Sequence, residues 1–500
     1  MARTKATSAK YYKIEFVDRI LDPVHGFIDV TQVEKEIIEL PIFKRMQSLK
    51  QLSLTNWVFP GAEHTRYMHS LGVMYIADLM AKNLKDENYK LRFNDAQRQL
   101  IRLAGLLHDI GHYPLSHVTE YVYNSNLLEE NNTLLNHNKN IKKKIDKLSS
   151  DEISVEDYMK NRYSKPMHHE TMGTKVIECD SKIKEIINRY CPFIDIQDIQ
   201  DIIVGCVERN PEISAMVQLI HSEVDADGID YVMRDATFSG TSYGGFELGL
   251  LLRNLVVKTY NGIEIVGIKP KGISVVDQYL VSKYFAYTQV IFNRHVAIFD
   301  AMAEIFSKVL VSLDYSPYPK PVTLNQHIKR HEMNDEYLKF TDRALWTQLD
   351  NIKKENLEGY VPEYIVRIHE KLLHYQEFDM AENGEIIITS NDKKDVCDKL
   401  KESSIYQELL SENEDKLILF HSRGFTSQIP EKKFREILDK INLDTTSEEK
   451  FIKYNTKRLQ EGVAVIEPQK SLKLLADDPR SIMSHLYGTE TYILREYKVS

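Results

Sequence analysis

One apolar segment that ends in ionisable side chains constrains this chain more than any other feature. Its apolar positions cover nearly the whole circumference of a helix, namely Leu100, Ile101, Leu103, Ala104, Leu106, Leu107 and Ile110. This pattern predicts a helix that is buried on all sides and begins after Asn94, a good N-cap. We expect it to stop at His108-Asp109, because Gly111 and Pro114 follow. A carboxylate and several imidazoles therefore lie at a buried helix end, where a shared divalent cation is the economical partner.

Further metal ligands are predicted on other helices. His69 lies in residues 65–77, whose apolar side chains recur at helical spacing, so its ring points inward or sideways. Residues 222–235 carry more carboxylates than a salt-bridged helix requires, and Asp227 among them is the candidate ligand. The metal set is therefore His69, His108, Asp109 and Asp227. This mixed nitrogen and oxygen set suits one divalent ion (Mn, Fe, Zn, Ni or Mg) without choosing among them. The alternative for any single buried histidine is a hydrogen-bonded core residue.

Several motifs together resemble the dNTP triphosphohydrolase branch of the HD phosphohydrolase superfamily, which includes the SAM-and-HD-domain enzymes and bacterial relatives. They are the segments 22–26, 51–52 and 58–62, the runs HTRYMHSLGV at 64–73 and HDIGHYPLSH at 108–117, the pair His169-Glu170, and the acidic residues from Asp225 to Asp235. The resemblance covers roughly residues 18–310, and the combined motifs are far more specific than an isolated His-Asp pair.

The resemblance implies attack of water on the α-phosphorus of a dNTP, with release of deoxynucleoside and triphosphate. It also implies a nucleotide substrate accompanied by additional Mg, an allosteric nucleotide, and a homo-oligomer, either a dimer or a tetramer. Gly228 and Ile291 depart from the family pattern at phosphate-contacting positions. Two alternatives stay open: an HD phosphohydrolase for another nucleotide, such as a monophosphate or cyclic phosphodiester, and a nucleotide-sensing regulator.

Three further histidines are the acid-base candidates, since imidazole titrates near neutrality. They are His112, His117 and His169. Glu120 follows His117 by three residues, so on a helix its carboxylate can hold the imidazole in one tautomer. The resemblance implies that His117 is the general acid and that His112 and His169 contact phosphate. The alternative is that some of these rings only support the metal ligands.

Candidate substrate contacts complete the predicted site. Arg66 precedes His69 by three residues and can pair with phosphate oxygens in the same pocket. The resemblance assigns phosphate to Lys283 and Arg294, the deoxyribose to Asp235 and Tyr231, and the sugar and base to Gln51 and Leu52. Each of these residues has a surface salt bridge or core packing as its alternative role.

The whole chain is expected to be mostly α, with an HD-domain helical core, a small β-hairpin and an α+β C-terminal region. Residues 1–17 form a tail, 18–310 the core and 311–500 the C-terminal region. Within the core, the Asn- and Lys-rich residues 124–164 are predicted to be a polar insertion, either a solvated loop or a lid.

Local signals predict several elements. We expect a helix over 33–54 with a break at Pro41, and a hairpin over 256–266 turning at Asn261-Gly262. A long helix is expected over 275–310, a linker at Pro317, Pro319 and Pro321, and short strands at 386–388 and 492–494.

Charge and hydropathy limit the partners. The formal net charge of −9 argues against a general nucleic-acid binder. The basic N-terminus is not followed by an apolar stretch, and no apolar run approaches the ~20 residues that span a bilayer. The sequence therefore predicts a cytoplasmic protein without a membrane partner.

Overall fold

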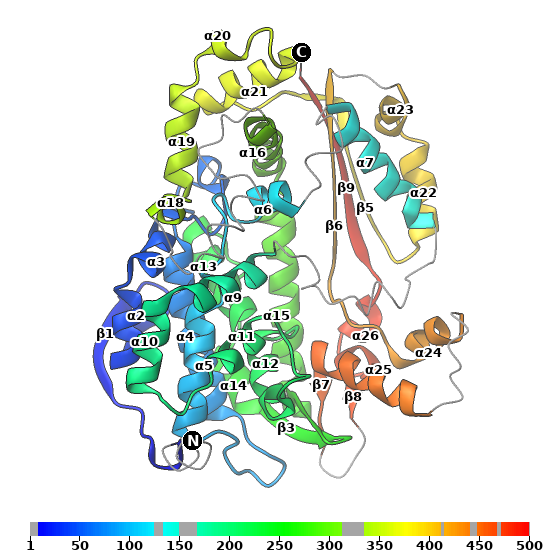
Figure 1. Cartoon of the computed structure of the whole chain (residues 1–500). Coiled ribbons are helices and arrows are strands. Elements are labelled where there is room, and N and C mark those ends of the chain that lie inside the picture. The colour runs from blue at the N-terminus through cyan, green and yellow to red at the C-terminus, as the bar shows by residue number, and fades with distance from the viewer. Residues whose placement is uncertain are drawn as a thin grey trace.

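The computed structural model describes residues 9–124, 134–149, 168–312, 335–411, 415–440, 448–467 and 472–499. Helices dominate this part of the chain, which also forms three small sheets (Figure 1). The predicted fold class, mostly α with an α+β C-terminal region, is confirmed.

The first part of the chain builds the helical core. Its elements are β1 (Phe16–Asp22), β2 (Gly26–Thr31), α2 (Gln32–Ile38), α3 (Pro41–Lys44), α4 (Arg66–Asn83), α5 (Asp95–Leu107), α6 (His117–Asn124), α7 (Leu134–Asp146), α9 (His169–Cys179), α10 (Ser181–Tyr190), α11 (Ile196–Ile203), α12 (Ser214–Ile220), α13 (Ala226–Ser239), α14 (Leu248–Asn254), β3 (Leu255–Tyr260), β4 (Ile263–Ile268), α15 (Ile273–Phe285) and α16 (Arg294–Ser312).

The remaining elements form the C-terminal region. They are α18 (Asp335–Leu338), α19 (Asp342–Asn351), α20 (Lys354–Leu357), α21 (Glu363–Leu373), β5 (Met380–Ser390), α22 (Lys393–Lys401), α23 (Ser404–Leu410), β6 (Lys416–Gly424), α24 (Glu431–Lys440), α25 (Glu448–Glu461), β7 (Ala464–Val465), β8 (Lys473–Leu474), α26 (Met483–Leu486) and β9 (Glu490–Lys498).

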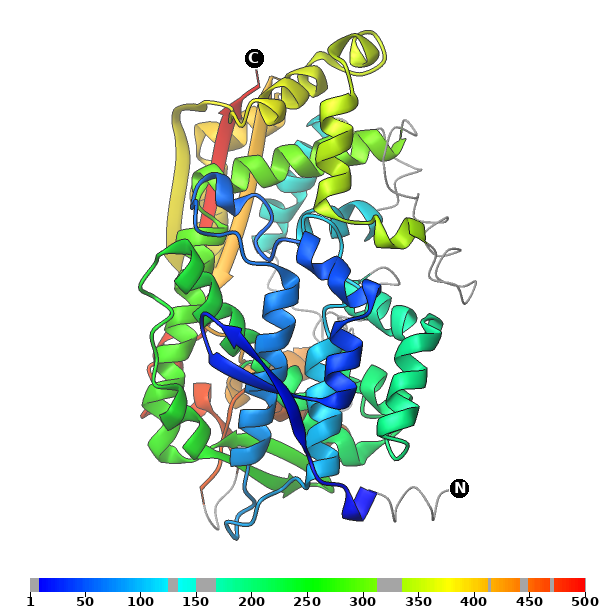
Figure 2. The same cartoon turned by 90° about the vertical axis from the view of Figure 1, so that its left-hand side faces the viewer.

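Helix α5 is the buried helix that the apolar pattern predicted. The six predicted apolar positions within it, and Ile110 just after it, are at most 7% exposed, and Asn94 caps the helix by accepting the backbone N–H of Gln97. The helix packs against α4 and α11, and α4 in turn packs against α13. The hairpin of β1 and β2 lies over α4 (Figure 2). Two glycines allow these close approaches: a Cβ at Gly105 would press on the Met74 backbone, and a Cβ at Gly72 would overlap the carboxylate of Asp230.

Two predicted helices are wrong in extent. The helix expected over 33–54 breaks at Pro41 as predicted, but regular helix ends with a 3-10 turn at Arg45–Ser48. The helix expected over 275–310 is two helices joined by a π-helical turn, Ala286–Ile291. Asn293 interrupts it because its side chain accepts the backbone N–H of His295 and so caps α16. The apolar periodicity of the sequence continues through this junction, so the pattern alone predicts one uninterrupted helix.

The predicted hairpin is confirmed. β3 pairs antiparallel with β4, and the turn residues Asn261 and Gly262 both have positive φ, 51° and 80°. The predicted strands at 386–388 and 492–494 lie within β5 and β9. The predicted proline linker falls outside the described residues.

Part of the predicted insertion differs from the expected loop or lid. Within 124–164 the structure describes residues 134–149, and these form helix α7 and a short 3-10 turn. Ile141 and Ile145 on α7 are buried in a small apolar cluster with Val396 and Ile418 of the C-terminal region. Their apolar face is obscured in the sequence by the Asn and Lys residues around it.

The C-terminal region shares the core of the preceding part. β9 lies between β5 and β6 in an antiparallel sheet, while β7 pairs parallel with β4 and extends the β3–β4 hairpin. The largest apolar cluster contains residues from both parts, including Phe306 and Phe340. Among the described residues, no helix combines the length and apolar character needed to cross a membrane.

Candidate metal and phosphate site

The turn after α5 presents the candidate ligands. Helix α5 ends at Leu107, as the following Gly111 and Pro114 predicted, and His108 is its C-cap. The chain then reverses through Leu115 and Ser116, whose φ angles of 50° and 54° are unusual for residues other than glycine. Such backbone strain occurs often at functional sites. Helix α6 begins directly afterwards, at His117.

The four predicted metal ligands come together from α4, the end of α5 and α13. One ligand atom each from His69, His108 and Asp109 lies within 4.8 Å of the others. Oδ1 of Asp227 lies 2.9 Å from Nε2 of His69 and 4.0 Å from Nε2 of His108. The His69 and Asp109 side chains are at most 2% exposed, whereas that of Asp227 is 40% exposed. The group is therefore buried on one side and open on the other.

The residues present fit a metal ion. Nδ1 of His69 lies 2.7 Å from Asp230, and Nδ1 of His108 lies 2.8 Å from the Gly105 carbonyl oxygen. These acceptors favour a proton on Nδ1 and so leave each Nε2 to face the other ligand candidates. Both Nε2 atoms are buried and make no hydrogen bond of normal geometry with the described residues. Burial lowers the pKa of His108, which keeps its imidazole neutral as a ligand requires.

Asp230 organises the groups behind His69. Its carboxylate also contacts Nε2 of His25 at 2.5 Å and accepts from the Arg234 guanidinium, which in turn pairs with Asp22. Burial opposes its charge, but Arg234 holds the pKa of Asp230 well below its usual value. From the sequence, Asp230 was only one of several carboxylates within residues 222–235. Its spacing of three residues from Asp227 on one helix was the available signal.

Arg66 forms an ion pair with Asp109, one of the candidate metal ligands. It reaches the predicted pocket, but its Nη1 donates to Oδ2 of Asp109 at 2.7 Å and its Nε donates to Ser116. Although burial raises it, the pKa of Asp109 is held well below its usual value by the Arg66 charge. Asp109 therefore remains ionised in its buried position.

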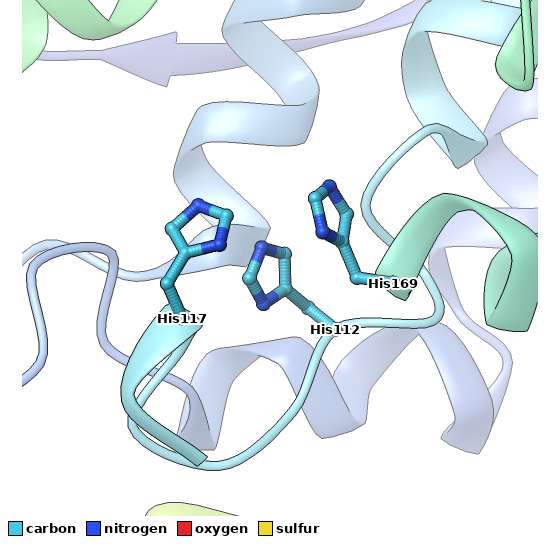
Figure 3. A group of neighbouring side chains, drawn as sticks. All are labelled: His112, His117 and His169. Carbon is cyan, nitrogen blue, oxygen red and sulfur yellow. The ribbon is translucent and has the colours of Figure 1, made fainter. Parts of the chain in front are cut away.

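The acid-base candidates form a second group, the histidine trio, next to the metal-ligand set. Figure 3 shows His112 between His117 and His169, which belong to the first turns of α6 and α9. The ring centroid of His112 lies 4.3 Å from that of His169 and 4.9 Å from that of His117. Nε2 of His112 is 3.8 Å from Oδ1 of Asp109, so the trio adjoins the metal ligands.

The three imidazoles have different environments. His112 is fully buried, neither ring nitrogen has a hydrogen-bond partner in the described residues, and burial lowers its pKa well below the usual value. Burial also opposes the charge of His169, but the adjacent Glu120 carboxylate raises its pKa to about 9. The His117 side chain is 58% exposed. The trio therefore combines a neutral, a cationic and a solvent-facing imidazole.

Glu120 holds two members of the trio. Its Oε2 lies 2.8 Å from Nδ1 of His117, the contact expected from their spacing, and both carboxylate oxygens lie 3.3 Å from Nδ1 of His169. The Glu120 residue is only 6% exposed. Burial opposes its charge, yet the two imidazoles lower the pKa of Glu120 far below its usual value. Glu120 therefore fixes the proton of His117 on Nδ1 and leaves Nε2 facing outward.

Most predicted sugar and base contacts lie near one another. The Gln51 carbonyl oxygen accepts from Arg66, and the Gln51 backbone N–H donates to the carbonyl oxygen of His64. Nε2 of His64 lies 2.8 Å from Oδ1 of Asp235. Leu52 packs against an apolar cluster that includes Ala236. His64 begins the motif at 64–73, but no role was predicted for it.

The predicted phosphate-binding cations separate. The Lys283 ammonium lies 5.9 Å from the ring centroids of Tyr231 and Tyr279, beside the segment that carries Asp227. A Cβ at Gly228 would lie 3.5 Å from that ammonium. Arg294 is instead exposed at the start of α16, where its Nε contacts His295 and its carbonyl oxygen accepts from Tyr497. Among the described residues, none of the predicted site contacts Arg294.

A family model for the HD domain matches residues 66–198, which include the metal-ligand candidates other than Asp227 and the whole histidine trio. This part of the chain is similar to the HD domain. The sequence also matches the uncharacterized protein YwfO of Bacillus subtilis, with 29% identity over 275 residues, 54% of this chain and 51% of that protein. The chain thus spans about half the length of that relative.

Two further similarities agree with this assignment. The deoxynucleoside triphosphate triphosphohydrolase SAMHD1 of Gallus gallus is 43% identical over 97 residues, 19% of this chain and 16% of that enzyme. The resemblance noted from the motifs is thereby confirmed for part of the HD-domain chain. A crystal structure of a hypothetical protein from Aquifex aeolicus matches with a TM-score of 0.62 at 22% identity, covering 96% of each chain. The last similarity shows the fold alone.

Proposed function

We propose that this HD-domain protein hydrolyses dNTPs to deoxynucleoside and triphosphate by attack of water on the α-phosphorus. The observation that carries the proposal is the adjacency of two groups: the metal-ligand set and the histidine trio held by Glu120. The partial identity to a deoxynucleoside triphosphate triphosphohydrolase supports the choice of substrate.

His69, His108, Asp109 and Asp227 would hold one divalent ion. When bound, that ion would supply Lewis acidity to a phosphoryl group and to water. The open side at Asp227 leaves room for both. The donor set of two imidazoles and two carboxylates does not select among the divalent metals.

The protein's own groups manage protons and charge. His117 in its doubly protonated form donates the Nε2 proton to the departing sugar oxygen, while its Nδ1 proton stays hydrogen-bonded to Glu120. The cationic His169 and the neutral His112 face phosphate oxygens. Helix α6 begins at His117 and helix α9 at His169, so the positive ends of both helix dipoles add positive potential where the phosphates bind.

Sugar selection is assigned to α13 and the segment before α4. Asp235, oriented by His64, accepts the 3′-hydroxyl of the deoxyribose, while the Tyr231 ring closes the side where a ribose would carry its 2′-hydroxyl. Gln51 and Leu52 line the adjoining sugar and base position. Nucleotide activation and assembly into a dimer or tetramer stay predictions from the resemblance.

The decisive experiment is product analysis in ¹⁸O-labelled water. The purified protein is incubated with each dNTP and with Mn or Mg, with and without GTP, and the products are separated by chromatography. We expect deoxynucleoside and triphosphate, with the label in the triphosphate because water attacks the α-phosphorus. His108→Ala/Asp109→Ala should abolish the reaction, and His117→Ala should reduce it by about 100-fold. His485→Ala, an exposed histidine on α26, serves as the control.

Other outcomes discriminate the alternatives. Release of inorganic phosphate from monophosphates, or opening of cyclic phosphodiesters, would replace the proposed substrate while keeping an HD phosphohydrolase. Absence of any product from all these nucleotides, with nucleotide binding unchanged in Asp109→Ala, would instead favour a nucleotide-sensing regulator.

A further inference from the structure

The end of β6 packs directly against the segment that precedes α13. Glu223 accepts from Thr426 Oγ1 at 2.9 Å and from the Ser427 backbone N–H at 2.9 Å. The Phe425 ring stacks on Tyr284 of α15, with centroids 3.9 Å apart and planes at 15°. These contacts hold a segment of the C-terminal region a few residues from Asp227, in a chain where β6 and α13 are almost two hundred residues apart.

Arg423, two residues before Phe425, presents a positive charge that no carboxylate of the described residues pairs. Its guanidinium carbon lies 3.7 Å from the ring centroid of Tyr287, in the π-helical turn between α15 and α16. In the described part of the chain it forms no ion pair, and its Nε is buried without a hydrogen-bond partner. Partly buried cations are normally paired with carboxylates, so this one is available to an anion.

The surroundings of Arg423 connect it to the metal-ligand set. Burial and neighbouring tyrosines raise the pKa of Tyr231 well above its usual value, and the Arg423 charge opposes that rise. Burial likewise raises the pKa of Tyr279, against the same Arg423 charge. Arg423 and the Asp227 carboxylate therefore act on the same two hydroxyls, and the contacts of Thr426 and Ser427 with Glu223 hold the Arg423 segment against the one that carries Asp227.

Lys283 lies at the same cluster of tyrosines. Its ammonium lies 5.9 Å from the Tyr231 and Tyr279 rings and 3.4 Å from the carbonyl oxygen of Glu223. The Tyr279 hydroxyl is fully buried and has no hydrogen-bond partner among the described residues. Absence of a side chain at Gly228 keeps this region open, because a Cβ there would lie 2.3 Å from that hydroxyl.

A polyphosphate needs more positive charge than the predicted residues supply. Arg66 is neutralised by Asp109, and Arg294 contacts His295 and Tyr497 instead of the site. Of the lysine and arginine side chains predicted for phosphate, only Lys283 is left at the site within the described residues, in addition to the His169 imidazolium.

We propose that the end of β6 completes the nucleotide pocket, and that Arg423 binds a phosphate group of the polyphosphate together with Lys283. This inference rests on the proposed function, because it assumes a nucleotide polyphosphate at the metal-ligand set. It gives the C-terminal region a direct role in substrate binding.

The test compares Arg423→Gln and Arg423→Lys with the wild-type protein. A matched control is Arg435→Gln: this arginine of α24 also lies over an aromatic ring, Phe451 at 3.9 Å, but is exposed and paired with Glu431. Calorimetric titration of the metal-depleted protein with tripolyphosphate measures phosphate binding without hydrolysis. Steady-state kinetics with dNTPs and metal then separate KM from kcat.

We expect Arg423→Gln to weaken tripolyphosphate binding and raise KM by about 10- to 100-fold, with kcat changed only a few-fold. Arg423→Lys should be intermediate, and Arg435→Gln unchanged. If Arg423→Gln does not fold, modification of wild-type Arg423 by phenylglyoxal replaces it: tripolyphosphate should slow the modification, and an unchanged rate would overturn the proposal.

The outcomes separate this inference from the proposed function. Hydrolysis of dNTPs by the wild type, with unchanged KM and tripolyphosphate binding in Arg423→Gln, overturns the role of Arg423 and leaves the proposed function standing. Tripolyphosphate binding that is lost in Arg423→Gln, in a protein that hydrolyses no dNTP, supports the role of Arg423 and removes the proposed reaction.

Discussion

At the scale of single side chains, the site depends on acceptors that orient the imidazoles from behind. Asp230 accepts a hydrogen bond from His69, the Gly105 carbonyl oxygen accepts one from His108, and Glu120 accepts one from His117. Each contact places a proton on one nitrogen and leaves the other nitrogen of the ring for the site. Substitution of the acceptors therefore tests the site as directly as substitution of the ligands does.

Asp230→Asn should weaken metal binding by about 10- to 100-fold, because an amide holds the His69 tautomer less firmly than a carboxylate. Titration of the metal-depleted protein with Mn²⁺ measures the affinity. Asp277→Asn is the control, since this buried carboxylate is bonded to Ser481 and lies outside the metal-ligand set. Equal Mn²⁺ affinity in Asp230→Asn and the control would contradict the orienting role.

Glu120→Gln should change the titration of His169. In the wild type the carboxylate raises the pKa of His169 to about 9, so its positive charge persists at neutral pH and is lost as the pH rises through about 9. Without that charge, burial dominates, and His169 should lose its proton below its usual value of about 6.5. NMR titration of the imidazole ring protons reports the change. An unaltered His169 titration in the variant would show that Glu120 does not set it.

At the scale of elements, the turn after α5 and the start of α9 must touch backbone to backbone. A Cβ at Gly111 would lie 2.1 Å from the Gly173 nitrogen and 2.4 Å from the His169 carbonyl oxygen. Neither atom belongs to a flexible side chain. The contact positions His169 against His112, because each of the two rings is carried by one of the touching segments.

Gly111→Ala should therefore displace α9, lower the free energy of unfolding by about 2 kcal/mol or more, and reduce activity at least tenfold. Thermal or urea unfolding and kinetics with the preferred nucleotide measure both effects. Gly249→Ala is the matched control: a Cβ on this α14 glycine meets nothing within 4 Å, so alanine should be neutral or stabilising there. Similar behaviour of the two variants would argue against the backbone contact.

At the scale of the whole molecule, the C-terminal region and the preceding residues 18–310 share one apolar core. The largest apolar cluster contains buried residues such as Tyr337 and Leu417 together with those of α4 and α5. β7 extends the sheet that begins with β3 and β4. The boundary expected near residue 310 divides the sequence by its motifs but does not divide the apolar core.

A chain ending at Ser312 should therefore lack a cooperative thermal transition, because it would expose the apolar surface that the C-terminal region covers. Calorimetry and circular dichroism of this fragment, compared with the full chain, measure the loss. Coexpression with residues 313–500 should restore the transition. A sharp, reversible melt of the fragment alone would contradict a shared core.

Sequence alone was sufficient where the deciding signal is local. The apolar circumference of α5, its Asn94 cap, the Asn261-Gly262 turn and the three-residue spacing of His117 and Glu120 are all short-range features. Such features act within a few residues through backbone conformation and hydrogen bonding, so a pattern in the chain predicts them. The metal-ligand candidates were found by the same means, together with a family resemblance.

Only the tertiary structure decided which distant groups meet. It brought His25 and Asp22 to Asp230 and Arg234, committed Arg66 to Asp109, moved Arg294 away from the site and placed Arg423 beside Tyr287. These outcomes depend on packing between segments up to about two hundred residues apart, and no local periodicity encodes such pairings. The charge of a side chain follows from the sequence. The fold decides whether a partner neutralises that charge or whether the charge stays free for substrate.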